Sequence, residues 1–321
     1  MTTTTTDAGR GVSPAVHFDK VEKRFDAATA LAGLTLDVRR GEMFGLIGPD
    51  GAGKTTAIRL LCGLLHTDAG TVRVFDRDPV RDHAWVTARV GYLSQRFSLY
   101  GDLTIDENIE FFAEIHGVRH YKARRDALLD MTQLTAFRGR LADRLSGGMK
   151  QKLALACTLV HEPELIVLDE PTTGVDPVSR REFWKLLSAF LARGITIVMS
   201  TPYLDEAERC ARVALLHDGR TLALDEPSRL RTLIGGRIVE VMAPGRSDAA
   251  AVARTLPGVA DVQVFGERLH LTLEGDTDAA VDAVARQIAT TSLAGASVRA
   301  VLPSLEDVFI ATLARKEQAG A

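Results

Sequence analysis

One short stretch restricts the fold of this chain more than any other: G-P-D-G-A-G-K-T-T at residues 48–56. It follows the apolar run E-M-F-G-L-I (42–47) and runs into T-T-A-I-R-L-L-C-G-L-L (55–65), whose apolar residues recur at helical spacing. The stretch matches the pattern G-x-x-x-x-G-K-[ST] in the strand-to-helix context that this pattern requires. We therefore predict a phosphate-binding turn between a strand and a helix.

The residue types in this turn suit an anion. Glycines let the backbone approach phosphate oxygens and turn successive N–H groups inward, and the helix start behind them adds its positive dipole end. Lys54 can reach the β- and γ-phosphates of a nucleotide, and Thr55 can ligate Mg²⁺. The alternative is a glycine-rich turn in which G-K-T occurs by chance. The predicted nucleotide-binding residues are Gly48, Pro49, Asp50, Gly51, Ala52, Gly53, Lys54, Thr55 and Thr56.

A second apolar run, L-I-V-L-D-E (165–170), supplies acidic groups that the turn lacks. It suits a buried parallel strand, with Asp169 at its end holding Mg²⁺ directly or through water. Glu170 is one residue further and can act as general base for a hydrolytic water. By itself an apolar strand that ends in two acids is more often structural, but downstream of a phosphate-binding turn the functional reading is favoured.

The order of the patterns predicts an α/β fold. Strand-like and helical segments alternate up to about residue 235, which implies a parallel sheet covered on both faces, with a helical insertion at about 96–160. Residues 236–321 follow the order βαββαβ of a small ferredoxin-like domain, closed by a helix with Ser304 as N-cap. Residues 1–14 are predicted to be a disordered tail, and residues 15–235 the main domain.

Composition excludes several classes of protein. Of the 321 residues 46% are hydrophobic and 25% charged, and the net charge of −3 comes without a densely basic window, so no nucleic-acid partner is expected. No stretch approaches the ~20 apolar residues of a membrane-spanning helix. The three cysteines, Cys62, Cys157 and Cys210, are far apart and are expected to be buried, reduced thiols.

A third motif, L-S-G-G-M-K-Q-K (145–152), places two glycines after a serine at a predicted helix start. This is a second site suited to phosphate. One chain has no use for two such helix starts at one γ-phosphate, but in a head-to-tail dimer each can close the other chain's turn.

With these motifs in this order, residues 15 to about 235 resemble the ATP-binding subunits of ABC transporters. The resemblance implies a P-loop NTPase of ABC type, with a parallel-sheet core, an antiparallel β subdomain and a helical subdomain, and ATP and Mg²⁺ as ligands. The tail P-S-L-E-D-V-F (303–309) resembles subunits that serve ABC-2-type exporters, including multidrug pumps. The implied roles are adenine stacking for Phe25, contact with Mg²⁺ and the membrane subunit for Gln95, contact with the partner's ATP for Ser146, Gly147 and Gly148, and a loop that links the two sites for Asp176.

One position departs from the family pattern. After the apolar run I-T-I-V-M (195–199), the frame Y-L-D-E-A (203–207) fits the family, so Pro202 occupies the place of a histidine that hydrogen-bonds the γ-phosphate. Proline has no side-chain donor and no backbone N–H. Either hydrolysis is slow, or the hydroxyl of Thr201 or Tyr203 replaces the histidine. Because the general base Glu170 is present, an ATPase with slow turnover is favoured over an inactive one.

The resemblance implies a cytoplasmic chain, peripheral at the inner face of the cell membrane. Its expected partners are membrane-spanning permease subunits and a second ATPase chain, in a homodimer or heterodimer that ATP closes. The alternatives are an ABC ATPase without a transport role and a nucleotide-sensing module with little turnover. The first usually has tandem cassettes or long coiled coils, which this sequence lacks, whereas Pro202 keeps the second open.

Overall fold

The computed structural model describes residues 13–26, 28–95, 98–235, 237–243, 248–275 and 277–320. The chain divides into two compact units, Met1–Leu224 and Asp225–Ala321, whereas the sequence analysis places the boundary near residue 235. Almost all of the predicted disordered tail lies outside the described residues. Each unit is described by itself below.

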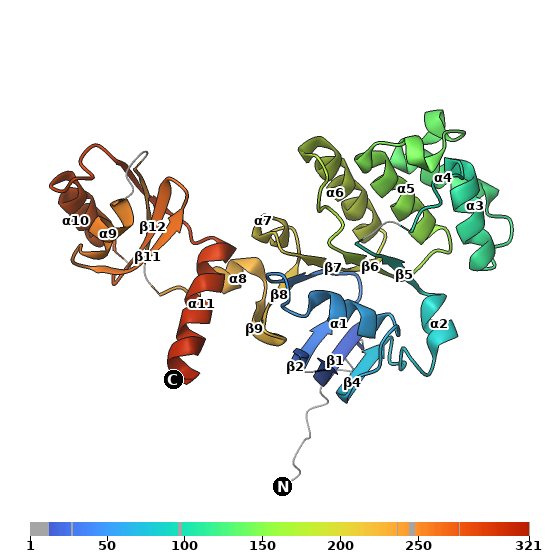
Figure 1. Cartoon of the computed structure of the whole chain (residues 1–321), viewed down its shortest axis with the longest axis horizontal. Helices are drawn as coiled ribbons and strands as arrows, with labels where there is room; N and C mark the ends of the chain where they lie inside the picture. Colours follow the sequence, from blue (N-terminus) through green and yellow to red (C-terminus); the bar gives the residue numbers. More distant parts are fainter. Residues whose placement is uncertain are drawn as a thin grey trace, which may run out of the picture. The chain divides into compact units, whose positions relative to one another are not determined.

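The first unit is built on a six-stranded sheet (Figure 1). Its strands, in spatial order, are β5 (Val90–Leu93), β6 (Leu165–Asp169), β7 (Thr196–Thr201), β3 (Met43–Ile47), β8 (Arg212–His217) and β9 (Arg220–Asp225). Each neighbouring pair from β5 to β8 is parallel. Every residue of β3 and β6 is buried, as the continuous apolar runs predict for strands covered on both faces. The sequence analysis did not identify β9.

A separate antiparallel sheet lies in the same unit, with strands in the order β2 (Ala28–Val38), β1 (Val16–Phe25) and β4 (Ala69–Val74). One hydrophobic core joins the two sheets, since Phe18 of β1, Phe44 of β3 and Leu165 of β6 belong to the same buried cluster. The antiparallel β subdomain is therefore packed against the parallel core as the family resemblance implies.

Helices make up the rest of this unit (Figure 1). The insertion between β5 and β6 carries a helical subdomain in which α5 packs against both α3 and α4. The helices and 3₁₀ turns are α1 (Lys54–Leu61), α2 (His83–Thr87), α3 (Ile105–Ile115), α4 (Lys122–Thr132), η1 (Thr135–Phe137), η2 (Ala142–Arg144), α5 (Gly147–Leu159), α6 (Pro177–Leu191) and α7 (Leu204–Ala207). All three cysteines are buried and free, as predicted.

The second unit is a ferredoxin-like α+β domain. Its antiparallel sheet has the order β11-β12-β10-β13, and apolar residues of α9 and α10 share a core with one face of this sheet. The unit also contains α8, which the sequence analysis did not identify. Its elements are α8 (Pro227–Arg231), β10 (Ile238–Met242), α9 (Ala249–Arg254), β11 (Val259–Phe265), β12 (Arg268–Leu273), α10 (Asp278–Ala289), β13 (Ser297–Val301) and α11 (Leu305–Gly320).

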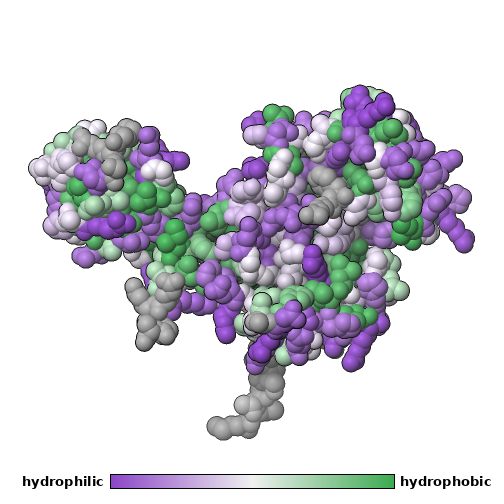
Figure 2. All heavy atoms as spheres, viewed as in Figure 1, coloured by the Kyte–Doolittle hydropathy of each residue, from purple (hydrophilic) through white to green (hydrophobic). Residues whose placement is uncertain are grey.

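On the face of each unit drawn in Figure 2, hydrophilic and hydrophobic residues are interspersed. Within the described part of the chain, no helix combines the length and the apolar character needed to cross a membrane.

Candidate nucleotide-binding site

The turn 48–56 lies at the carboxyl end of β3, and α1 begins within it. Close packing requires glycine at two positions of the turn, Gly48 and Gly53. A Cβ on Gly48 would collide with the carbonyl oxygen of Leu216 in β8, and one on Gly53 would lie 2.5 Å from the carbonyl oxygen of Ala30 in β2. Gly53 also has φ +97°, in the left-handed region that favours glycine. The turn is thus packed closely between the two sheets.

Lys54 is the buried cation of the turn. Its side chain is 3% exposed, and its Nζ donates to the carbonyl oxygens of Gly48 at 2.8 Å and Pro49 at 3.0 Å. The same Nζ lies 3.3 Å from Oε1 of Glu170. The lysine and the residue after the acidic strand, which are far apart in the sequence, therefore lie side by side.

Asp169 ends β6 and is buried. Its Oδ1 accepts hydrogen bonds from the hydroxyls of Thr55, at 3.1 Å, and Ser200, at 2.6 Å. The topology explains this meeting, because β7 lies between β3 and β6 and the carboxyl ends of these parallel strands share one edge. Ser200 was not predicted as a site residue. It lies opposite Asp169 in the β6–β7 register, a pairing that the sequence patterns do not reveal.

Glu170 has a different environment. It adopts φ +49°, which is unusual for a residue other than glycine, and its N–H donates to the carbonyl and hydroxyl oxygens of Ser200 at 3.1 and 3.0 Å. Its Oε2 accepts a hydrogen bond from Nε2 of Gln95 at 3.1 Å. Gln95 and Lys54 therefore contact different oxygens of one carboxylate.

These groups face a cleft of about 490 Å³. Asp50 also lines it. The full lining is Ala28, Thr29, Ala30, Asp50, Gly51, Ala52, Gly53, Lys54, Thr55, Thr56, Gln95 and Glu170. Phe25 ends β1 and is 43% exposed, with the Lys23 ammonium 5.5 Å from its ring centroid. Phe25 is therefore not a residue of the hydrophobic core.

Three residues of the third motif, Ser146, Gly147 and Gly148, are called the signature residues, and none of them lines this cleft. Ser146 caps α5 and accepts from the N–H of Met149 at 3.4 Å, whereas Gly148 is buried so closely against Ser179 of α6 that a Cβ would collide with it. Asp176 caps α6, and its bonds with the side chain and N–H of Ser179 hold the pKa of its carboxyl below the usual value. Signature and Asp176 are thus neighbours, but neither lines the chain's own cleft.

Pro202 follows the last residue of β7 and is half-buried. The hydroxyl of Thr201 accepts from the N–H of Tyr203 at 3.0 Å and donates to Glu206 at 2.8 Å. The ring of Tyr203 lies against the guanidinium of Arg180, with 5.1 Å from ring centroid to Cζ. Thr201 therefore already uses its proton within the protein, which weakens its candidacy as a replacement for the missing histidine.

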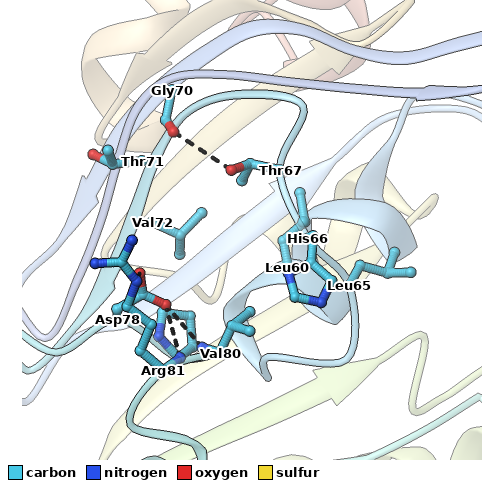
Figure 3. A pocket seen from close by; sticks show the side chains of 11 residues that line it. Leu60, Leu65, His66, Thr67, Gly70, Thr71, Val72, Asp78, Val80 and Arg81 are labelled. Atoms are coloured by element: carbon cyan, nitrogen blue, oxygen red, sulfur yellow. Dashed lines mark hydrogen bonds and ion pairs between the residues drawn. The ribbon is translucent and has the colours of Figure 1, made fainter.

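A second hollow, of about 280 Å³, opens beside the end of α1 and β4 (Figure 3). It is lined by Leu60, Val72 and Val80 together with polar residues such as His66 and Asp78. The Asp78 carboxylate is occupied by the N–H groups of Val80 and Arg81, at 3.0 and 3.1 Å. None of the predicted site residues lines this hollow.

The fold and the site define a P-loop nucleoside-triphosphatase. Comparison with known proteins narrows the class: the ABC transporter family model matches residues 31–173. The chain is 40% identical to the probable multidrug ABC transporter ATP-binding protein YbhF of Escherichia coli over 92% of its own length and 51% of that protein, so it spans about half of this relative. It is 36% identical to the daunorubicin resistance ATP-binding protein DrrA2 of Streptomyces coeruleorubidus, over 92% of this chain and 94% of that one. The chain belongs to the ABC transporter family as an ATP-binding protein.

Other relatives and solved structures agree. The Nod factor export ATP-binding protein I of Paraburkholderia xenovorans is 39% identical over 79% of this chain and 84% of that one. An ATP-binding subunit of an ABC transporter is 29% identical with a TM-score of 0.63, over 68% of this chain and 92% of that one. A bacterial ABC transporter cassette, described as dimeric, is 25% identical with a TM-score of 0.60, over 66% and 98%.

Proposed function

We propose that this chain hydrolyses ATP and, through ATP-driven closure of a dimer, energises a membrane exporter. The observation that carries the proposal is the convergence of Lys54, Asp169 and Glu170 at one edge of the parallel sheet. The names of the relatives support export, since they refer to multidrug transport, daunorubicin resistance and Nod factor export. They differ in cargo, so the proposal extends to export and leaves the cargo open.

Each residue at the edge has a task in hydrolysis. The N–H groups of the turn and the ammonium of Lys54 bind the phosphates and neutralise their charge. Glu170 accepts a proton from the attacking water. Gln95, which already contacts Glu170, orients this carboxylate. Phe25, exposed at the end of β1, offers a ring face on which adenine can stack.

The same edge has the donors that Mg²⁺ prefers. The Thr55 hydroxyl and the Asp169 carboxylate are 3.1 Å apart, and the Gln95 side chain approaches from β5. Mg²⁺ binds through one or two carboxylates, waters and substrate phosphates rather than through an all-protein cage. When bound, the ion would neutralise charge on the β- and γ-phosphate oxygens.

Dimer formation is supported by the separation of the signature from the cleft. Ser146 and Gly147 are exposed at the start of α5, where their N–H groups can reach a phosphate held by another chain. The dimeric cassette among the solved relatives supports such a pairing. The partner ATPase is either a second copy or a different chain. Residues 236–321 would support dimerisation or docking, not chemistry.

A permease is the proposed membrane partner, because the names of the relatives describe ATP-binding proteins of transporters or export systems. Binding to it would place the chain at the inner face of the cell membrane.

Two variants test the proposed activity. Lys54→Ala should abolish ATP binding or turnover, because this ammonium is the cation that the site aims at the phosphates. Glu170→Gln preserves shape without basicity, so ATP should stay bound and a dimer should persist on gel filtration while phosphate release falls by about 10²-fold or more. Parent-like turnover in both variants would refute the site.

A second candidate function is nucleotide sensing with little turnover, which Pro202 favours. The Glu170→Gln comparison separates the two. If the parent chain binds ATP but releases phosphate no faster than Glu170→Gln, the chain is a sensor and not a pump ATPase.

A further inference from the structure

One buried carboxylate lies beside the switch position, which is Pro202 at the place of the family's histidine, and the roles above do not explain it. Glu206 lies on α7, the single helical turn that follows Pro202, and it is 1% exposed. Burial of a carboxylate is unfavourable unless hydrogen bonds and opposite charge replace water. The contacts that replace water around the Glu206 carboxylate therefore show which segments this side chain connects.

Those contacts come from three separate segments. Oε1 accepts from the hydroxyl of Thr172 at 2.5 Å, and Oε2 accepts from the hydroxyl of Thr201 at 2.8 Å. The guanidinium Nε of Arg180 lies 3.7 Å from Oε1. Thr172 is two residues after Glu170, Thr201 directly precedes Pro202, and Arg180 lies on α6. One side chain thus joins the segments that carry the general base and the switch position.

The sheet cannot make this connection by itself. The β6–β7 ladder ends with the pair Asp169 and Ser200, and the last bond between the two strands runs from the N–H of Glu170 to Ser200. Beyond this point Pro171 begins a turn, and no backbone bond between the segments 171–175 and 201–207 occurs in this described part of the chain. The Glu206 carboxylate is the direct bridge that the structure places there.

We propose that Glu206 is a positioning residue for ATP hydrolysis: it holds the loop after Glu170 and the switch segment at Pro202 in a fixed relation across the end of the sheet. This inference rests on the proposed ATPase function. The clamp does not touch the phosphates. It acts through Glu170, because a small displacement of the base relative to the attacking water slows the chemical step without changing how ATP binds.

The experiment compares Glu206→Ala and Glu206→Gln with a matched control. Glu42 is also a carboxylate of the first unit, 9% exposed, and its Oε1 accepts from the N–H of Arg39 at 2.7 Å and from Arg212 at 3.1 Å. Glu42→Ala thus removes a buried, paired carboxylate remote from the cleft lining. Melting temperature, ATP affinity, kcat and KM are measured for all variants.

We expect Glu206→Ala to lower kcat by about 10- to 100-fold, with KM and ATP affinity within about twofold of the parent. Glu206→Gln retains the length and one accepting oxygen, so its kcat should lie between those of parent and Ala variant. Glu42→Ala should lower the melting temperature and leave kcat unchanged. A kcat for Glu206→Ala that falls no further than that of Glu42→Ala at equal loss of stability would overturn the proposal.

A second measurement does not depend on turnover. Hydrogen exchange of the nucleotide-free chain should accelerate in segment 171–175 as well as in 201–207 when Thr172 is changed to Val, because one arm of the clamp is lost without a change of side-chain shape. Thr172→Val also serves if Glu206→Ala does not fold. Unchanged exchange in 201–207 would contradict a clamp. If the parent chain has no ATPase activity but exchange is accelerated in Thr172→Val relative to the parent, the proposed function is refuted and the clamp is supported.

Discussion

Asp169 and Glu170 are adjacent carboxylates with different surroundings. Asp169 is buried and accepts from two hydroxyls on neighbouring elements. Glu170 turns out of the strand with φ +49°, and its carboxylate contacts Lys54 and Gln95 at the cleft. The first environment holds the Asp169 carboxylate in a fixed position at the edge of the sheet, which suits a cation ligand. The second environment places the Glu170 carboxylate at the cleft, which suits a general base.

At the scale of single residues, we predict the effect of the variant Pro202→His on turnover. Pro202 has no donor at the place where the family resemblance implies a histidine, and the Thr201 hydroxyl donates to Glu206, so it is not free to replace the histidine. Loss of one such donor typically costs ~10²–10³ in rate. We expect basal turnover of the isolated chain to be low and to rise by about tenfold or more in Pro202→His, in kcat rather than in ATP affinity.

The control for this prediction is Tyr203→Phe, which removes the only other hydroxyl proposed for the role. A drop in turnover in this variant would identify Tyr203 as the replacement donor. If the parent turns over fast and neither Pro202→His nor Tyr203→Phe changes its rate, then Pro202 does not slow hydrolysis.

At the scale of elements, the tail motif P-S-L-E-D-V-F has a structural explanation. Ser304 precedes α11 and accepts from the N–H of Asp307 at 3.2 Å, while the Asp307 carboxylate accepts from the Ser304 N–H at 2.7 Å, which is a reciprocal capping arrangement. The other oxygen of Asp307 bonds His270 of β12 at 2.8 Å. The motif therefore fixes the start of α11 on the sheet of the second unit.

A histidine between α5 and β6 makes stability depend on pH. The ring of His161 stacks on His116 with centroids 3.9 Å apart, and its Nε2 donates to the carbonyl oxygen of Val90 at 3.3 Å. Burial, with a smaller contribution from the His116 charge, lowers the pKa of His161 from 6.5 to about 4. Burial likewise lowers the pKa of His116. The fold thus favours the neutral ring.

It follows that the contribution of neutral His161 to the stability of the folded chain is complete above pH 6.5. This contribution is lost as the pH falls towards about 4, because His161 in the unfolded chain binds its proton at a higher pH than in the folded chain. We expect a loss of roughly 2 kcal/mol in the free energy of unfolding from this residue, after a discount for partial exposure. Urea unfolding across this window measures it. His161→Gln should flatten the pH dependence, whereas His66→Gln, at an exposed position, should not; equal slopes in all three proteins would contradict the assignment.

At the scale of the whole molecule, the division between Leu224 and Asp225 bears on how the chain can be shortened. The sequence suggests a cut near residue 235, which retains α8. The structure packs α8 against α11, and Leu230 and Ile234 are buried. A chain that ends at residue 235 therefore exposes these two side chains, whereas one that ends at Asp225 retains β9 and loses α8 as well.

We expect both shortened chains to bind ATP within about twofold of the full chain, because every residue that lines the cleft belongs to the first unit. The chain that ends at 235 should self-associate non-specifically more than the one that ends at 225, as seen by light scattering. Loss of ATP binding in a shortened chain with native circular dichroism would show that the second unit contributes to the site.

Much of this protein follows from local sequence patterns. The turn 48–56, the acidic strand end at Asp169 and Glu170, and the βαββαβ order of the second unit all depend on residues close together in the chain, where the spacing of glycine, apolar and charged residues determines backbone geometry. The same patterns explain why the helical insertion and the N-cap at Ser304 were predicted. They say nothing about which strands become neighbours.

The placement of β7 between β3 and β6 is a property of the packed sheet, and the features that depend on it emerge only in the tertiary structure. Ser200 meets Asp169, and Glu206 meets Thr172, because this placement brings the ends of two strands side by side. The stack of His116 on His161 likewise depends on how the helical subdomain packs. Such contacts join residues about 30 to 50 positions apart, and their energies depend on burial, which the periodicity of one segment does not encode.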